Sequence, residues 1–177
     1  MNWPRTSKIH WVGLILGLLL LAAVARLYGA AANPPQVQFI TDNIGPRQIE
    51  DVTARNIPRD YGRAWQTIAA ALEQNRAGVL DQYFVGFART KFGEAIAAQT
   101  KSGVHTRYID HGHKLAAYFY SPDGGAMELH DTAQLEIQIL DGSTVIHDEQ
   151  ATIHYVTLMT PAADRWNVRL LEAVPSF

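Results

Sequence analysis

The sequence predicts an α+β domain in which helices precede an antiparallel meander of four long strands. In the first half of the chain, apolar residues recur at helical spacing, whereas from Val104 onward apolar and polar residues alternate with a period of two. Turn sequences such as SPDGG and Asp141-Gly142 separate the alternating runs. Helices that precede such a meander pack on one face of the sheet, and we expect the long strands to curve around them into a cone.

Length and composition limit the classes of protein to which the chain can belong. Its 177 residues, 47% of them apolar, suit one packed domain with an appendage. Cysteine is absent, which excludes disulfides and thiolate metal sites. Without the basic residues Arg5, Lys8 and Arg26 of the N-terminal segment, 12 basic and 17 acidic residues remain, a net charge of −5. This balance argues against a nucleic-acid partner, because phosphate binding needs clustered positive charge.

An apolar segment near the N-terminus has the features of a membrane insert. The run WVGLILGLLLLAAV carries no charge, two basic residues precede it, and one follows it. We therefore expect residues 9–25 to contact a membrane, with a hydrophobic helix over 9–28 that is either a retained anchor or a cleaved signal peptide. A buried helix of a soluble protein is the third interpretation.

The positive charges before this segment predict the direction in which the chain crosses the membrane. Residues 1–8 would form a short cytoplasmic tail, by the positive-inside rule. The rest of the chain would then lie in the periplasm or outside. We expect a single-pass protein of a bacterial inner membrane.

Residues 29–57 are expected to link this segment to a domain over 58–177. The sequence NPP within 32–42 favours an extended tether. Pro46 can open a short helix, because proline fits the first turn, and we expect Asn56–Pro58 to end it.

Two helical stretches are expected at the start of the domain. The first begins near Pro58 and carries an apolar stripe at spacings of four, three and four, formed by Tyr61, Trp65, Ile68 and Leu72. The second covers residues 79–99. Gly86 and Gly93 weaken it, so that we expect a bend or two shorter helices there.

Four strands complete the domain, and the second shows the clearest pattern. They are expected over residues 104–120, 127–139, 145–159 and 165–174. In the second strand the odd-numbered positions are mostly apolar and the even-numbered positions polar, which indicates one buried and one wet face.

The words RAWQTIAAALEQ, VLDQYFVGFARTKF and DRWNVRLLEA, in this order, resemble the NTF2-like superfamily, which includes SnoaL-like and ketosteroid-isomerase-like proteins. Within it the chain is most similar to the non-enzymatic domain of plastid-division proteins. The resemblance covers residues 59–174 and implies a cone-shaped α+β fold. It carries no function, because this fold hosts enzymes, binders and scaffolds.

Asp131 is the main candidate for a functional residue, because it interrupts the apolar face of the second strand. A carboxylate there is costly unless it is paired or lies in a wet pocket. It could be turned outward by a β-bulge at His130–Asp131, or line a polar pocket, or act as a general base of the isomerase type beside a tyrosine. The candidate pocket residues are Tyr108, His113, Tyr118, Asp131, Tyr155 and Glu172.

Residues 108–115, YIDHGHKL, raise the question of a metal. His111 and His113 would share a face on a regular strand, but no third ligand is evident. The main alternative is a turn at Asp110–Gly112, with Asp110 capping backbone groups and Gly112 at positive φ. A pocket or pH-sensitive role is the third possibility. We expect no metal and no other cofactor; His111 and His113 are the weak candidates for ligands.

The sequence therefore favours a membrane-anchored NTF2-like domain that binds a protein partner of the envelope or a small apolar ligand without catalysis. One alternative is an isomerase or dehydratase that uses an acid or histidine in the cone. Another is an accessory subunit of an envelope complex. The enzyme hypothesis requires Asp131, Glu172 and a tyrosine or histidine to converge in a closed apolar pocket, and it fails if Phe, Leu and Trp side chains fill the cone.

Overall fold

The computed structural model describes residues 35–42 and 44–177, which fold as one compact unit. Residues 1–8, the hydrophobic helix expected over 9–28 and its membrane contact over 9–25 lie outside the described residues. Within the described part of the chain, no helix is long and apolar enough to cross a membrane.

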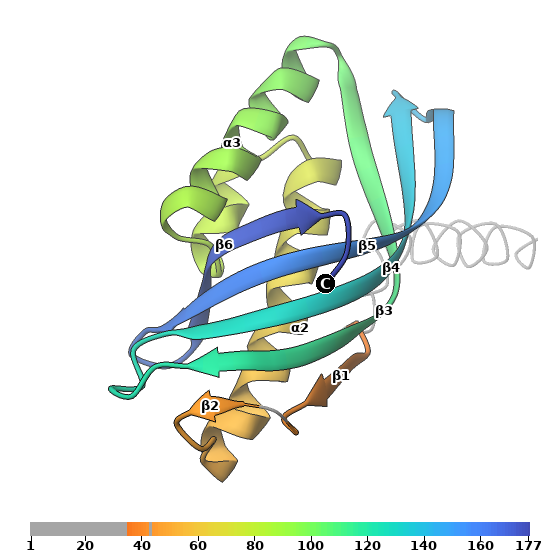
Figure 1. The fold of residues 1–177 in the computed structure, drawn as a ribbon. Coiled ribbons are helices and arrows are strands. Elements are labelled where there is room, and N and C mark those ends of the chain that lie inside the picture. Colours follow the sequence, from red (N-terminus) through yellow and green to blue (C-terminus); the bar gives the residue numbers. More distant parts are fainter. Residues whose placement is uncertain (1–34, 43) are drawn as a thin grey trace, which may run out of the picture. The chain divides into compact units, whose positions relative to one another are not determined.

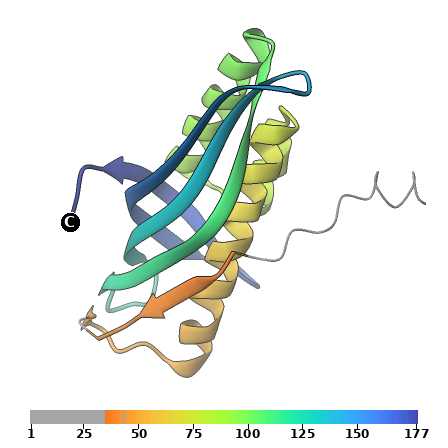
Figure 2. The ribbon, with the colours of Figure 1, turned by 90° about the vertical axis from the view of Figure 1, so that its right-hand side faces the viewer.

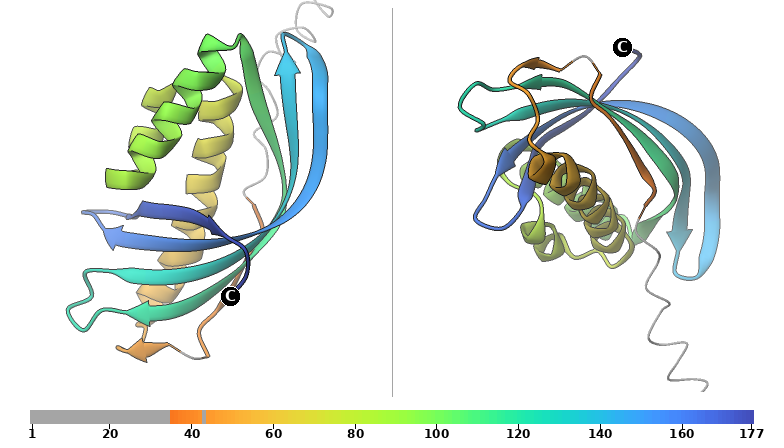
Figure 3. Two further views of the ribbon diagram at one scale, coloured as in Figure 1. Left: turned by 45° about the horizontal axis from the view of Figure 1, so that its top comes forward. Right: turned by 90° about the horizontal axis from the view of Figure 1, so that it is seen from below.

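The predicted α+β architecture is confirmed: helices pack on one face of a curved sheet (Figure 1). The sheet has the strand order β1-β3-β4-β5-β6, with β2 also pairing β3. Its four long strands run antiparallel, as expected, and are β3 (Val104–Tyr120), β4 (Met127–Asp141), β5 (Thr144–Pro161) and β6 (Trp166–Val174). The strands wrap around the helices when seen end-on (Figure 3).

The sheet is mixed rather than purely four-stranded, because two short strands join it in parallel. They are β1 (Val37–Ile40) and β2 (Gly45–Pro46), and both pair with β3. Figure 2 shows β1 beside β3 at the sheet edge. The tether expected over 32–42 is therefore wrong for β1, because Val37 and Phe39 pack against the core while the backbone completes the ladder.

The first helix, α2, spans Asp51–Glu73 without a break. The prediction that Asn56–Pro58 ends a short helix was wrong, and so was the linker boundary at residue 57. Interior proline costs a helix about 3 kcal/mol. Here Ile57 and Tyr61, on either side of Pro58, are fully buried, and their packing holds the helix together.

The second helical stretch divides as expected at Gly86. A 3-10 helix, η1 (Ala77–Gln82), precedes α3 (Gly86–Lys101), whose first residue has φ +54°. Glycine tolerates that backbone conformation, and the chain turns there into α3. Gly93 lies inside α3 and does not interrupt it.

A single core fills the space between α2, α3 and the inner face of the sheet, which we define as the face toward the helices. Its fully or almost fully buried members include Trp65, Ile68, Phe84, Leu115, Leu129, Met159, Val168 and Leu171. Trp65 of the predicted apolar stripe belongs to it, and so does Trp166. The hollow that a curved sheet leaves is therefore occupied by side chains.

Candidate functional site

Asp131 lies at the centre of the inner face and has no exposed surface. Its Oδ2 accepts hydrogen bonds from the Tyr61 hydroxyl at 2.7 Å and from the His113 ring at 2.8 Å. The β-bulge proposed at His130–Asp131 is wrong, because Leu115 and Ala116 of β3 pair with these residues without a register shift. Regular alternation therefore carries the carboxylate inward, and two donors compensate its burial.

His113 connects Asp131 to a second carboxylate. Its Nδ1 bonds to Asp131 and its Nε2 to Asp110 Oδ2, both at 2.8 Å. We call Tyr61, Asp110, His113 and Asp131 the polar cluster. Its members come from α2, β3 and β4, so that it ties the helix to two central strands.

A β-bulge at His111 makes this geometry possible. Asp110 pairs with Leu135 and Gly112 with Gln134, which leaves His111 as the extra residue. Residues three apart on a regular strand face opposite sides, but the bulge brings Asp110 and His113 to the same side. The turn expected at Asp110–Gly112 is thus a bulge inside a continuous strand. Its two predicted details hold, since Asp110 Oδ1 accepts the Gly112 N–H at 2.8 Å and Gly112 has φ +130°.

The two carboxylates determine the charge of the imidazole. Burial by itself would lower the pKa of His113, but hydrogen bonds to Asp110 and Asp131, and their charges, raise it to about 9. At neutral pH the ring is an imidazolium that donates from both nitrogens. Burial and the nearby Asp131 charge raise the pKa of the Tyr61 phenol, so that its hydroxyl stays protonated and donates.

Aromatic rings close the cluster from the other sides. Trp65 lies 4.8 Å from the His113 ring and 5.4 Å from Tyr155, centroid to centroid. Tyr108 lies 6.2 Å from Trp65. Burial raises the pKa of both Tyr108 and Tyr155. An indole face beside an imidazolium is a favourable cation–π arrangement.

The inner part of the cluster is sealed, whereas Asp110 at its border keeps 17% of its side chain exposed. Tyr61, Trp65, His113 and Asp131 are each at most 4% exposed. Within the polar cluster, the buried Asp131 Oδ1 has no hydrogen-bond partner. The unpaired oxygen is what a general base would present, but no substrate reaches it in this packing.

Two of the predicted pocket residues lie elsewhere. Tyr118 is 61% exposed on the outer face, which faces away from the helices. The bulge at His111 reverses the phase of β3 after Tyr108, so that Leu115 and Ala117 face inward and Tyr118 faces outward. Glu172 pairs with Lys91 of α3 at 2.6 Å instead of joining Asp131. A register shift in β5–β6, opposite Arg169, breaks the alternation on which its placement depended.

The two candidate metal ligands point in different directions. His113 faces the core, whereas the His111 side chain is half exposed and lies 3.7 Å from Glu136. Within residues 35–42 and 44–177, no group of three histidine or acidic side chains could hold a metal ion. The bulge changes the phase of β3 at His111. It therefore turns His111 and His113 to opposite faces and brings Asp110 and His113 to the same face.

Sequence reasoning missed two buried partners on α2. Tyr61 was assigned only to the apolar stripe, yet its hydroxyl bonds Asp131. Asp60 is fully buried, pairs with Arg59 and accepts the backbone N–H of Trp166 at 2.9 Å. The sequence offered one signal for Tyr61, since a tyrosine in the apolar stripe of a helix can reach an acid on the inward face of a strand. It offered no signal for Asp60.

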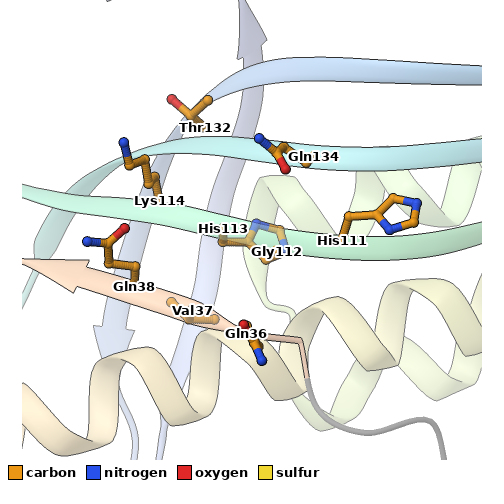
Figure 4. A pocket seen from close by; sticks show the side chains of 9 residues that line it. All are labelled: Gln36, Val37, Gln38, His111, Gly112, His113, Lys114, Thr132 and Gln134. Atoms are coloured by element: carbon orange, nitrogen blue, oxygen red, sulfur yellow. The ribbon is translucent and has the colours of Figure 1, made fainter.

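The outer face carries a shallow groove across β1, β3, β4 and β5. Figure 4 shows the part that lies over β1, β3 and β4. We call it the outer groove. Its two adjoining parts share His111 and Gln134, and its other lining residues are Gln36, Val37, Gln38, Gly112, His113, Lys114, Thr132, Leu135, Gln150, Ala151 and Thr152.

A stack of rings lies beside the outer groove. His130 is sandwiched between Tyr118 and Phe177, at centroid distances of 4.5 Å and 4.4 Å and nearly parallel to both. We call these three residues the aromatic stack. His154 contacts Phe177 edge-on and bonds Thr132 at 3.1 Å, which joins the stack to the groove.

No protein-family model and no curated protein matches the sequence. Solved structures match the fold. The intermembrane-space region of chloroplast protein ARC6 superposes with a TM-score of 0.61 at 12% identity, over 73% of this chain and 100% of that one. A provisionally assigned NTF2-like dehydratase of Streptomyces avermitilis gives 0.46 at 11% identity, over 67% and 96%. A provisionally assigned scytalone dehydratase of Novosphingobium aromaticivorans gives 0.44 at 10%, over 66% and 83%. At these identities the likeness concerns the fold alone, and the superposition on the ARC6 region supports the α+β arrangement of helices on a curved sheet.

Proposed function

We propose that this chain is a membrane-tethered, non-catalytic NTF2-like binding module on the outer side of a bacterial inner membrane. The observation that carries the non-catalytic part is the sealed cone. The acid, imidazole and phenol that an enzyme of this fold would use are all buried, and they bond one another. The apolar, uncharged segment over residues 9–25 supports the tether.

Solvent exchange of the Trp65 indole N–H tests the sealed cone. The indole is only 2% exposed, so that packing shields this proton from solvent. In a sealed cone it exchanges through opening of the core and is as slow as the most protected backbone amides. Exchange as fast as that of an exposed indole would indicate a solvent-filled pocket and contradict the proposal.

Fractionation of cells that express the full chain tests the tether. We expect the chain in the membrane pellet after an alkaline wash, with its C-terminal part open to protease added from outside. Recovery in the soluble fraction would contradict the membrane part of the proposal and leave the sealed cone untouched.

One observation favours the isomerase or dehydratase alternative. Asp131 Oδ1 is unpaired beside His113 and Tyr61, as in a site that awaits a proton from a substrate. Opening would have to move Trp65 and Tyr155, which pack against each other over the cluster. Fast exchange of the Trp65 indole would therefore support this alternative.

A further inference from the structure

Six of the thirteen residues that line the outer groove carry uncharged side chains that both donate and accept hydrogen bonds. Four glutamines and two threonines line it: Gln36, Gln38, Gln134, Gln150, Thr132 and Thr152. An amide or hydroxyl side chain offers a donor and an acceptor at the same place. A hydroxyl group of a ligand does the same, so that either partner can donate at each contact.

The charge of the groove fits a neutral ligand. Two of its lining residues carry positive charge: Lys114, and His113, whose ring points inward between Asp110 and Asp131. Glu136 lies at the border of the groove, 3.7 Å from His111. A polyanionic ligand would need several cationic side chains in the groove, and a polycationic ligand would need several acidic ones.

The position of the groove disfavours an extended peptide. Peptides that add to a sheet pair with the free backbone of an edge strand. Of the strands that carry the groove, β1 is the edge strand and borders it on one side, whereas the ladders of β3, β4 and β5 already use the backbone groups beneath the rest. Recognition there depends on side chains, which Figure 4 shows spread over β1, β3 and β4.

The aromatic stack supplies an apolar platform next to these polar groups. Tyr118 is 61% and Phe177 55% exposed, although each also stacks on His130. Exposed rings that cluster on one face mark interaction sites, and tyrosine offers a flat apolar face with a polar tip. From His130 to Gln134 the outer face of β4 runs about 13 Å, longer than one sugar ring.

We infer that the outer groove and the aromatic stack bind a neutral oligosaccharide. The apolar C–H face of one sugar ring rests on Tyr118 or Phe177, and the hydroxyls of the following rings bond Thr132, Gln134 and Gln38. This inference rests on the proposed binding function and gives its ligand a chemical class.

Calorimetric titration of the full chain tests the inference. The chain is held in a zwitterionic detergent without sugar groups, and the probes are cellohexaose, the uncharged hexamer of N-acetylglucosamine, and an oligogalacturonate as the anionic probe. We expect binding of at least one neutral probe and none of the anionic probe. Absence of binding to both neutral probes, or equal binding of the oligogalacturonate, would overturn the inference.

Three variants locate the binding. Gln134→Ala removes one amide, with its donor and its acceptor, and is expected to weaken binding of the neutral probe about fivefold. Tyr118→Ala removes the exposed platform and is expected to weaken it by a similar factor. Gln48→Ala, an exposed glutamine outside the groove, is the matched control and should leave the affinity unchanged. Unchanged affinity in both groove variants would place any binding elsewhere and overturn the inference.

These results stay separate from those that test the proposed function. Loss of the neutral-sugar signal leaves slow Trp65 exchange and membrane recovery in place, and only the ligand class fails. Recovery in the soluble fraction with intact sugar binding removes the tether and keeps the groove.

Discussion

His113 and His130 lie on neighbouring strands, and each contacts a carboxylate and aromatic rings. His113 faces inward, has no exposed side-chain surface and bonds Asp110 and Asp131. His130 faces outward, is partly exposed, bonds Glu128 at 3.1 Å and is sandwiched between Tyr118 and Phe177. The same residue types thus form a buried, hydrogen-bonded ionic cluster inside the core and an accessible aromatic surface outside it. Burial makes the difference, since electrostatic interactions are strong where water is excluded and weak where it is not.

The largest expected difference between the two faces comes from removing one carboxylate on each. Asp131→Ala leaves a buried imidazolium and a buried phenol without their acceptor, and we expect a loss of about 3–5 kcal/mol in the free energy of unfolding. Glu128→Ala removes an exposed partner of His130 and should cost less than about 1 kcal/mol. Urea denaturation of the full chain measures both; equal losses would mean that the faces do not differ.

The next effect is the pH dependence of stability. The folded pKa of about 9 for His113 lies above the ordinary value of 6.5, so the imidazolium stabilises the fold fully below about pH 6.5. That stabilisation is lost as pH rises from 6.5 through 9, and amounts to about 3 kcal/mol at 1.36 kcal/mol per pH unit.

Unfolding free energies at pH 6, 7.5 and 9 measure this loss. His113→Gln should flatten the profile over that range, whereas His130→Gln, the outer-face control, should keep it. A profile that stays steep in His113→Gln would assign the titration to another group.

Removing one phenol oxygen from each face gives a smaller contrast. Tyr61→Phe deletes the 2.7 Å hydrogen bond to Asp131 and should cost about 1.5–3 kcal/mol, the usual value for a bond to a charged group. Tyr118→Phe changes an exposed ring and should stay within about 0.5 kcal/mol. Thermal unfolding measures both variants. An unchanged unfolding midpoint in Tyr61→Phe would show that the burial of Asp131 does not depend on this donor.

The smallest expected effect concerns the bulge that separates the two faces. Gly112→Ala places a Cβ at φ +130°, 3.3 Å from the Gln36 carbonyl oxygen, and should cost about 1–2 kcal/mol. Gly78→Ala, where a Cβ meets nothing within 4 Å, is the control and should cost little. In Gly112→Ala, His113 should be less tightly held between its carboxylates, so that raising the pH should cost this variant less stability than wild type. A larger alkaline loss in the variant would contradict the role given to the bulge.

Prediction from sequence worked where one regular pattern continued. From Met127 to Leu135 the odd and even positions of β4 divide between core and surface as expected, and Asp131 stood out because it violates that pattern. Tyr118 and Glu172 were misplaced for the opposite reason, since bulges changed the phase of β3 and β6. A bulge depends on how two strands pair, and neither strand's own pattern reveals it.

The sequence by itself determined the fold class, the four long strands, the inward direction of the Asp131 position and the capping role of Asp110. These features follow from periodicity and local backbone chemistry. Only the tertiary structure decided that Tyr61 reaches Asp131, that β1 and β2 join the sheet, and that the cone is filled. It also decided that His111 and His113 lie on opposite faces of β3, whereas Asp110 and His113 lie on the same face and bond each other. Each of these depends on the register between segments distant in the chain, and packing across the sheet sets that register.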